Sequence, residues 1–165
     1  MQVVDISNPS NPRIVGSVDT PGSAQGVAVS GVRVYVADNE PGVQVIDISD
    51  PTQPEIVSVV YTPGAAHGVA VTMTHAYVAD HRGIEVVDVS HPVGVQILGT
   101  APGIVRDVVV SGAYAFVADD LAGLGVIDVS NPATPQLVGA VNTIGNARAV
   151  AISANHAFVA DSYRG

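Results

Sequence analysis

The stretch GVIDVSNPATPQLVG, residues Gly125 to Gly139, places an aspartate inside a run of β-branched apolar residues and follows it with two prolines. The same phrase occurs three more times, as QVVDISNPSNPRIVG from residue 2, VQVIDISDPTQPEIVS from residue 43 and IEVVDVSHPVGVQILG from residue 84. One chain rarely needs four copies of a catalytic acid. The recurrence therefore favours a structural role for this aspartate and makes the repeat the feature that decides the fold.

Two markers define the repeat. The aspartates of the phrase recur at intervals of 42, 41 and 40 residues, a period typical of β-propeller blades. They are Asp5, Asp47, Asp88 and Asp128. The tripeptide VAD recurs in the same rhythm and ends at Asp38, Asp80, Asp119 and Asp161. Together the markers predict a single domain, residues 1–165, that is a β-propeller or half-propeller of four repeats.

The composition is that of an ordered all-β protein. Hydrophobic residues make up 47% of the chain, charged residues make up 13%, and there are 17 glycines and 11 prolines. This balance favours short strands joined by tight turns. No apolar run approaches the roughly 20 residues that a membrane helix needs. The net charge of −9 repels nucleic-acid phosphates and anionic lipids, so we expect neither a nucleic acid nor a membrane as a partner.

Signals for catalysis or a bound cofactor are missing from the sequence. The absence of cysteine excludes disulfide bonds, thiolate metal sites and a cysteine nucleophile. The five histidines have neither the H-x-x-x-H nor the H-E-x-x-H spacing of zinc sites, and there is no G-x-S-x-G elbow or glycine-rich phosphate loop. We therefore expect no cofactor, no metal and no enzymatic activity. Met1 is followed at once by strand-like sequence, which predicts no secretory signal in this chain and leaves its localisation unknown.

Each repeat offers four strand candidates, recognised by alternation or by β-branched runs between turn residues. In the second repeat these candidates are residues 68–71, 75–79, 43–48 and 55–60. By analogy with other propellers, the strand GVAV is expected innermost, AYVA second, VQVIDI third and EIVSVV outermost. Both faces of such a blade are buried between neighbours, which explains the long apolar runs. Val95 stands where the other repeats have proline, so we expect an irregular outer strand there.

The two ends of the chain would complete one four-stranded antiparallel blade, because the chain begins in a third strand and ends after a second one. Strands near Arg148–Ala160 would pair with strands near Gln2–Val18 and seal their exposed edges. The pairing can form within one chain, as a closed four-bladed monomer, or between two chains, as an eight-bladed ring. A four-bladed ring needs bulky side chains at its rim, but aromatic residues make up only 4% of the chain. We therefore favour the eight-bladed homodimer that shares its blades.

Both sets of marker aspartates are predicted to be structural. The first set, Asp5, Asp47, Asp88 and Asp128, is expected to accept hydrogen bonds from the backbone of the Ser-x-Pro turn that follows each residue. The second set, Asp38, Asp80, Asp119 and Asp161, begins hairpins and is expected to close Asx-turns. A calcium site is the alternative for the second set, with Asp119 and Asp120 as the best pair. Calcium takes about six to eight oxygens, and the chain lacks the spaced acids that would supply them.

Four polar residues stand 13 positions before the VAD aspartates and differ from repeat to repeat. They are Gln25, His67, Arg106 and Arg148. Because they precede the innermost strand, we expect them to ring the mouth of the central channel, where propellers commonly place their sites. Two arginines there can bind a carboxylate or a phosphate. The alternative is that the arginines pair with Asp107, with the VAD aspartates or with water.

The leading functional hypothesis is a non-enzymatic scaffold or binding module that self-assembles by strand exchange. Its ligand at the channel mouth is expected to be a small anionic or carbohydrate-like molecule or a protein loop. One alternative is a hydrolase- or lyase-type enzyme that uses His67 with Arg106 or Arg148 and an acid such as Asp80. Another is a purely structural piece of a longer surface propeller.

At these motifs the sequence resembles the LVIVD-repeat family. The resemblance rests on the pattern V-[IV]-D-[IV]-S-x-P together with [YF]-V-A-D, and it extends over essentially the whole chain. It implies a β-propeller, often in secreted or surface proteins of microbes and usually without an assigned activity. It supplies no catalytic residues to place on this sequence.

Overall fold

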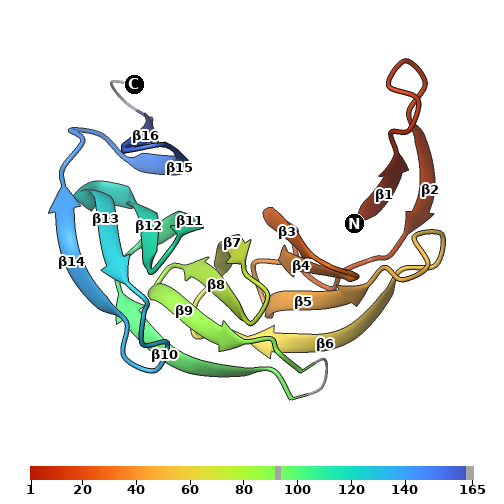
Figure 1. Cartoon of the computed structure of the whole chain (residues 1–165), viewed down its shortest axis with the longest axis horizontal. Helices are drawn as coiled ribbons and strands as arrows, with labels where there is room; N and C mark the ends of the chain where they lie inside the picture. Colours follow the sequence, from red (N-terminus) through yellow and green to blue (C-terminus); the bar gives the residue numbers. More distant parts are fainter. Residues whose placement is uncertain (92–93, 163–165) are drawn as a thin grey trace.

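The computed structural model describes residues 1–91 and 94–162, which form antiparallel β-sheets arranged in an open arc (Figure 1). Three four-stranded sheets, or blades, occupy the middle of the arc, and a two-stranded sheet lies at each end. Among the described residues the only helical turn is the 3₁₀ segment η1 (Asp120–Ala122). None of them forms a helix long and apolar enough to cross a membrane.

Each blade is an up-and-down sheet in which consecutive strands are neighbours. The first blade contains β3 (Gly26–Ser30), β4 (Arg33–Ala37), β5 (Gly42–Asp47) and β6 (Glu55–Tyr61). The second contains β7 (Ala66–Val71), β8 (His75–Asp80), β9 (Gly83–Asp88) and β10 (Gln96–Pro102). The third contains β11 (Val105–Ser111), β12 (Tyr114–Asp119), β13 (Gly123–Asp128) and β14 (Gln136–Val141). The N-terminal half-blade is β1 (Gln2–Asp5) with β2 (Arg13–Ser17), and the C-terminal half-blade is β15 (Ala147–Ser153) with β16 (His156–Asp161).

The predicted all-β architecture and its four-stranded antiparallel sheets are confirmed. The strand types also follow the predicted order, with β3, β7, β11 and β15 on the concave side of the arc and β6, β10 and β14 on the outer side (Figure 1). One part of the strand prediction is wrong, because it placed strands of two different sheets in a single blade. Residues 43–48 and 55–60 belong to the first blade, and residues 68–71 and 75–79 belong to the second. Strands joined by short hairpins pair with each other, and the connection from β6 to β7 passes to the next blade.

The irregularity expected near Val95 is not found in strand β10. This strand pairs with β9 and carries one register shift, but so do the outer strands of the other sheets, β2, β6 and β14. Residues 92–93 of the connection before β10 lie outside the described residues.

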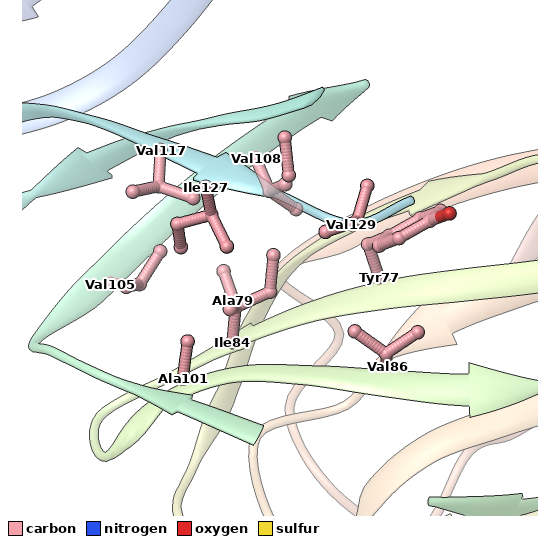
Figure 2. Packing of buried hydrophobic residues seen from close by; sticks show 11 residues of the cluster. Tyr77, Ala79, Ile84, Val86, Ala101, Val105, Val108, Val117, Ile127 and Val129 are labelled. Atoms are coloured by element: carbon pink, nitrogen blue, oxygen red, sulfur yellow. The ribbon is translucent and has the colours of Figure 1, made fainter. Parts of the chain in front are cut away.

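Neighbouring blades pack through small apolar side chains. Between the second and third blades, Tyr77 and Val86 belong to one buried cluster with Val108, Val117 and Ile127 (Figure 2). A similar cluster joins the first and second blades and consists of valines, alanines and one tyrosine, Tyr35. Both faces of the second blade are therefore buried, as the long apolar runs indicate.

Glycines let neighbouring blades touch at their inner and outer edges. At the inner edge, a Cβ on Gly26 would lie 2.7 Å from the carbonyl oxygen of His67 in the next blade. At the outer edge, a Cβ on Gly16 would lie 2.2 Å from the carbonyl oxygen of Pro51. Because both edges are in contact, the wedge between adjacent sheets is shallow.

The closed four-bladed monomer, which the sequence left as the alternative, is not formed. The half-blades β1–β2 and β15–β16 are separate sheets at opposite ends of the arc, and no strand pairing joins them among the described residues (Figure 1). The shallow wedge between blades is the physical reason, since a ring of only four blades needs a wide one. The eight-bladed homodimer stays a prediction.

The VAD aspartates are hydrogen-bonded to the loop that leads into the innermost strand of their own blade. Their backbone donors are Gly22 for Asp38 (2.8 Å), Gly64 for Asp80 (2.9 Å), Ile104 for Asp119 (3.1 Å) and Gly145 for Asp161 (3.0 Å). We call this repeated contact the loop clamp. It depends on a glycine beside the carboxylate, because a Cβ on Gly103 would lie 2.9 Å from Oδ2 of Asp119.

Among the three hairpins that the structure describes in full, the predicted Asx-turn is found only at Asp80. Asp80 accepts hydrogen bonds from the N–H groups of Arg82 (2.6 Å) and Gly83 (2.9 Å) in its own hairpin. For Asp38 and Asp119 the prediction is wrong, because each carboxylate is turned toward the preceding loop instead. The hairpin after Asp161 runs into residues 163–165, which lie outside the described residues.

The aspartates of the first set make the hydrogen bonds that the sequence predicts. The donors are the N–H groups of Ser7 to Asp5 (2.9 Å), Ser49 to Asp47 (2.7 Å), Ser90 to Asp88 (2.8 Å) and Ser130 to Asp128 (2.8 Å). Hydrogen bonding by these serines lowers the pKa of all four carboxyl groups, to about 2 in Asp47, where Arg33 contributes as well. The turns are exposed, so each lost bond can be replaced by water.

Asp80→Ala is therefore expected to destabilise the fold far more than Asp128→Ala. The first variant leaves the N–H groups of Gly64, Arg82 and Gly83 without their acceptor, which should lower the free energy of unfolding by about 3 kcal/mol. The second leaves one exposed N–H group that water can satisfy. Urea denaturation of both variants measures the difference, and equal losses would contradict the loop clamp.

A buried polar side chain occupies the same position in the third strands of the first two blades. Gln44 is fully buried and Glu85 is 2% exposed. Both amide atoms of Gln44 and Oε2 of Glu85 have no hydrogen-bond partner among the described residues. Burial, and to a smaller extent the charge of Asp80, raises the pKa of Glu85 to about 7.

Glu85→Gln is expected to stabilise the protein above neutral pH. Because the pKa of Glu85 is higher in the folded state than in the unfolded state, the contribution of Glu85 to wild-type stability is fullest below about pH 4.5 and falls until about pH 7. The loss amounts to about 3 kcal/mol, and the glutamine variant should escape it. Denaturation at pH 5 and pH 8 measures this difference. The exposed Glu55→Gln is the matched control, and the same gain in that variant would refute the assignment to Glu85.

Candidate functional site

A polar cavity of about 550 Å³ lies on the concave side of the arc, where the innermost strands begin. Its lining includes all four residues that the sequence places at the channel mouth: Gln25, His67, Arg106 and Arg148. The other lining residues are Asp107 of β11 and glycine, valine or alanine residues of β3, β7 and β15. The structure thus brings together four side chains that lie far apart in the sequence.

A β-bulge orients three of these four side chains. The pairing of the first and second strands shifts by one residue at His67, at Arg106 and at Arg148, so each residue has no partner on the neighbouring strand. Such a β-bulge turns a side chain out of the regular alternation of a strand. Gln25 lies just before β3 and donates its N–H to the carbonyl oxygen of Ala37 (2.7 Å).

Arg106 is held by an acid that the sequence did not assign to it. Its Nη2 donates to Oδ2 of Asp120 at 2.9 Å, and Nδ2 of Asn146 donates to Oδ1 of the same carboxylate at 2.5 Å. These hydrogen bonds, that of Asn146 first, lower the pKa of Asp120. Asp120 is buried in η1, where a second acid follows the VAD aspartate. The pair Asp119 and Asp120, considered for calcium, is therefore engaged by an arginine, an amide and a backbone N–H group.

His67 lies against a second histidine at the cavity wall. The ring centroids of His67 and His81 are 4.5 Å apart in an edge-to-face arrangement, and Nη1 of Arg106 lies 3.5 Å from Nε2 of His81. Burial lowers the pKa of His67, and the positive charges of His81, Arg106 and Arg148 lower it further against the opposing charge of Asp80. The imidazole therefore favours its neutral form in a positive local field.

Arg148 is the exposed cation of the cavity. Among the described residues its guanidinium has no hydrogen bond or ion pair, whereas the other cavity arginine is bound by Asp120. Asp107 does not pair with either arginine. Its Oδ1 accepts the N–H of Val108 (2.9 Å) and its Oδ2 accepts that of Val150 (3.0 Å), so it ties β11 to β15.

Sequence reasoning missed three features of this site. Nothing in the repeat pattern marked Asn146, His81 or the bulges, and Asp120 was noticed only as half of a calcium pair. The signal that was available is the extra acid in DDLAG, the one VAD hairpin with a second aspartate. Within residues 1–91 and 94–162, no three histidine, aspartate or glutamate side chains converge as metal ligands.

Several solved structures share this fold. The computationally designed Ika4 protein matches with a TM-score of 0.72 at 12% identity, covering 90% of this chain and 91% of that one. A functionally unknown protein from Desulfotomaculum acetoxidans matches with a TM-score of 0.72 at 16% identity, covering 86% of this chain and 49% of that one. The β-propeller domain of Cps50 (Swd1) from Myceliophteria thermophila matches with a TM-score of 0.69 at 14% identity, covering 90% and 55%. The chain thus spans about half the length of the last two, and at these identities the likeness shows the fold alone.

No curated protein matches the chain. The LVIVD repeat, in contrast, matches five segments that together span nearly the whole sequence: residues 1–20, 21–62, 63–99, 102–143 and 144–165. The three middle segments each begin just before an innermost strand and coincide with the three blades, and the two short end segments coincide with the half-blades. The repeat motifs, the propeller-like blades and this match together show that the chain belongs to the LVIVD-repeat family.

Proposed function

We propose that this chain is a non-enzymatic, self-assembling propeller module that binds an anionic group at its concave cavity. One observation carries the assembly: each end of the arc is half a blade, and the missing half is present at the opposite end. The N-terminal half-blade supplies third and fourth strands, and the C-terminal half-blade supplies first and second strands. Unpaired strand edges of this kind favour pairing with another chain.

Two copies joined at both ends would form an eight-bladed ring with two-fold symmetry. The shallow wedge between blades, produced by contacts at both edges, supports a large ring. The assembly would also enclose the cavity, because the concave side of each arc would face that of its partner. A longer propeller with further blades is the competing architecture, and the coverage of about half of two similar structures is compatible with either one.

Light scattering tests the assembly. We expect a mass near twice the 16.7 kDa of one chain, because both half-blades are then completed at once. A mass near 16.7 kDa would reject the self-assembling module and favour a structural piece of a longer propeller.

The arginines of the cavity support an oxyanion, a carboxylate or a phosphate, as the ligand. Arg106 is oriented by Asp120, and the exposed Arg148, which has no hydrogen-bond partner among residues 1–91 and 94–162, presents N–H donors near His67, whose pKa is lowered. A guanidinium binds such groups through paired, charge-assisted hydrogen bonds. A carbohydrate-like ligand or an uncharged protein loop would use the same donors without a negative charge of its own. The affinity for an anion should therefore fall with added salt more steeply than the affinity for these ligands.

Inorganic phosphate is the first probe for this cavity. Its binding, measured by calorimetry, should weaken roughly 10-fold in Arg148→Gln, because a charged hydrogen bond is lost. Arg13→Gln, which removes an exposed arginine from β2 outside the cavity, is the matched control and should leave binding unchanged. Equal weakening in both variants would mean that only net charge matters, and no binding to wild type would reject phosphate as the ligand.

An enzyme that uses His67 and Asp80 is the second candidate. The lowered pKa of His67 favours it, since perturbed histidines gather at active sites. Against it, the Asp80 carboxylate already accepts three backbone N–H groups, and burial with neighbouring cations is enough to explain the histidine. We therefore place binding before catalysis.

A further inference from the structure

We propose that a second copy of this chain docks its β15–β16 half-blade beside β1 in one defined register, with Phe158 as the anchor of the contact. This docking rests on the proposed self-assembly and adds its partner surface, its register and its contacting residues. Four features of the described structure indicate it: an apolar groove, the exposed Val27 that lines it, the exposed Phe158 and the open position beside Gly139.

The groove lies between β1 and the first blade. It has a volume of about 420 Å³ and is lined mainly by apolar side chains: Met1, Val3, Val4, Val27, Val29, Val34, Val36 and Ile48. In a complete blade, the space beside a third strand is filled by the first two strands of the same sheet. The groove is therefore the place where β15 and β16 of another copy would lie.

Val27 shows which surface the groove lacks. Its repeat equivalents Val69, Val108 and Val150 are 8%, 5% and 8% exposed, whereas Val27 is 64% exposed. The first three lie against a preceding blade that has its inner strands, and Val27 lies beside a half-blade that lacks them. Because the equivalent valine is buried in three repeats and exposed in the fourth, Val27 indicates a packing surface whose partner is missing.

Phe158 is the side chain that fits this contact. It occupies the position of Tyr35 and Tyr77, which are 4% and 5% exposed, but it is itself 60% exposed. Figure 2 shows the contact to be reproduced, with Tyr77 and Val86 of one blade against the cluster that includes Val108 and Val117 of the next. By repeat equivalence, Phe158 of the second copy with Val3 of the first would cover Val27, which is exposed, above Val36, which is already buried.

The register follows from the complete blades. In the third blade Tyr114 lies opposite Asp128, Ala115 opposite Ile127 and Phe116 opposite Val126. Transferred to the half-blades, this pairing places His156 opposite Asp5, Ala157 opposite Val4 and Phe158 opposite Val3. The position of His156 opposite Asp5 then repeats that of Arg33 opposite Asp47, which form an ion pair in the first blade. It also repeats the position of His75 opposite Asp88 in the second.

The outer edge supplies the fourth feature. Gly16 and Gly99 each hold the proline-bearing turn of the next blade so closely that a Cβ would clash with the carbonyl oxygens of Pro51 and Pro132. Their equivalent Gly139 has only Val126 of its own sheet near the position of a Cβ. The turn that contains Pro9 and Pro12, at the other end of the arc, is exposed. In the docked pair, this turn of one copy would lie on Gly139 of the other.

Cysteine cross-linking tests the register in a chain that has no cysteine of its own. The double variant Val4→Cys with Ala157→Cys leaves Phe158, His156 and Asp5 in place. Residues that face each other in a hydrogen-bonded antiparallel pair have Cα atoms about 5.5 Å apart, within disulfide range. We expect oxidation to give a covalent product of two chains that reductant reverses.

The matched control is Val4→Cys with Ala160→Cys, whose second cysteine lies three residues along the same strand, roughly 10 Å out of register. It should remain uncrosslinked. A disulfide within one chain of the first variant would overturn the proposal, because the occupant of the groove would be the chain's own half-blade. No disulfide in a protein of two-chain mass would overturn this register and leave the proposed self-assembly in place, whereas a one-chain mass would overturn both.

Phe158→Ala tests the anchor without altering the paired backbone. We expect the dissociation constant of the dimer to rise at least roughly 30-fold, as for a central aromatic contact of an interface. Tyr61→Ala is the control, since Tyr61 is an aromatic of the outer strand β6 that is 74% exposed and lies outside the groove. An unchanged dissociation constant in Phe158→Ala would overturn the anchor role, provided that circular dichroism shows the variant to be folded.

Discussion

The close approach of neighbouring blades at both of their edges is the constraint on which the shape of this molecule depends. At the concave side Gly26 lies against the backbone of the next blade, and at the rim Gly16 and Gly99 lie against proline-bearing turns. Between these contacts the core is filled by valine, alanine and isoleucine with few aromatics. Small side chains in the core and close backbone contacts at both edges keep the wedge between neighbouring sheets shallow. Three blades and two half-blades therefore make an arc and not a ring.

The same backbone that builds the arc also aims the residues of the cavity. Each VAD aspartate fixes the loop before an innermost strand, and the bulge that follows in three of the repeats turns one polar side chain toward the concave side. The aspartates that recur in every repeat therefore fix the backbone, and the polar residue that differs between repeats determines what the cavity can bind. Arg106 and Arg148 illustrate the difference that a single neighbour makes, because one is bound by Asp120 and the other is exposed.

Buried polar side chains lower the stability of the sheets, and the apolar pattern of the repeat does not predict them. Gln44 and Glu85 occupy the position that glycine occupies in the third blade, Gly125. Their side chains are buried with atoms that lack partners among the described residues. Buried polar atoms without partners cost free energy, and the raised pKa of Glu85 makes stability depend on pH.

The sequence by itself determined the period, the four strand types and their order from inside to outside, the serine-bound aspartates and the four residues of the cavity. The period and the cavity residues follow from aligning the repeats, and the other properties are encoded in short segments where alternation, turn chemistry and short-range hydrogen bonds act. Only the tertiary structure decided that the arc is open, that the VAD aspartates clamp a preceding loop, and that Asp120 rather than Asp107 binds Arg106. Each of these depends on distances between backbones that lie 14 or more residues apart or in different blades, and such distances result from packing that no local pattern records.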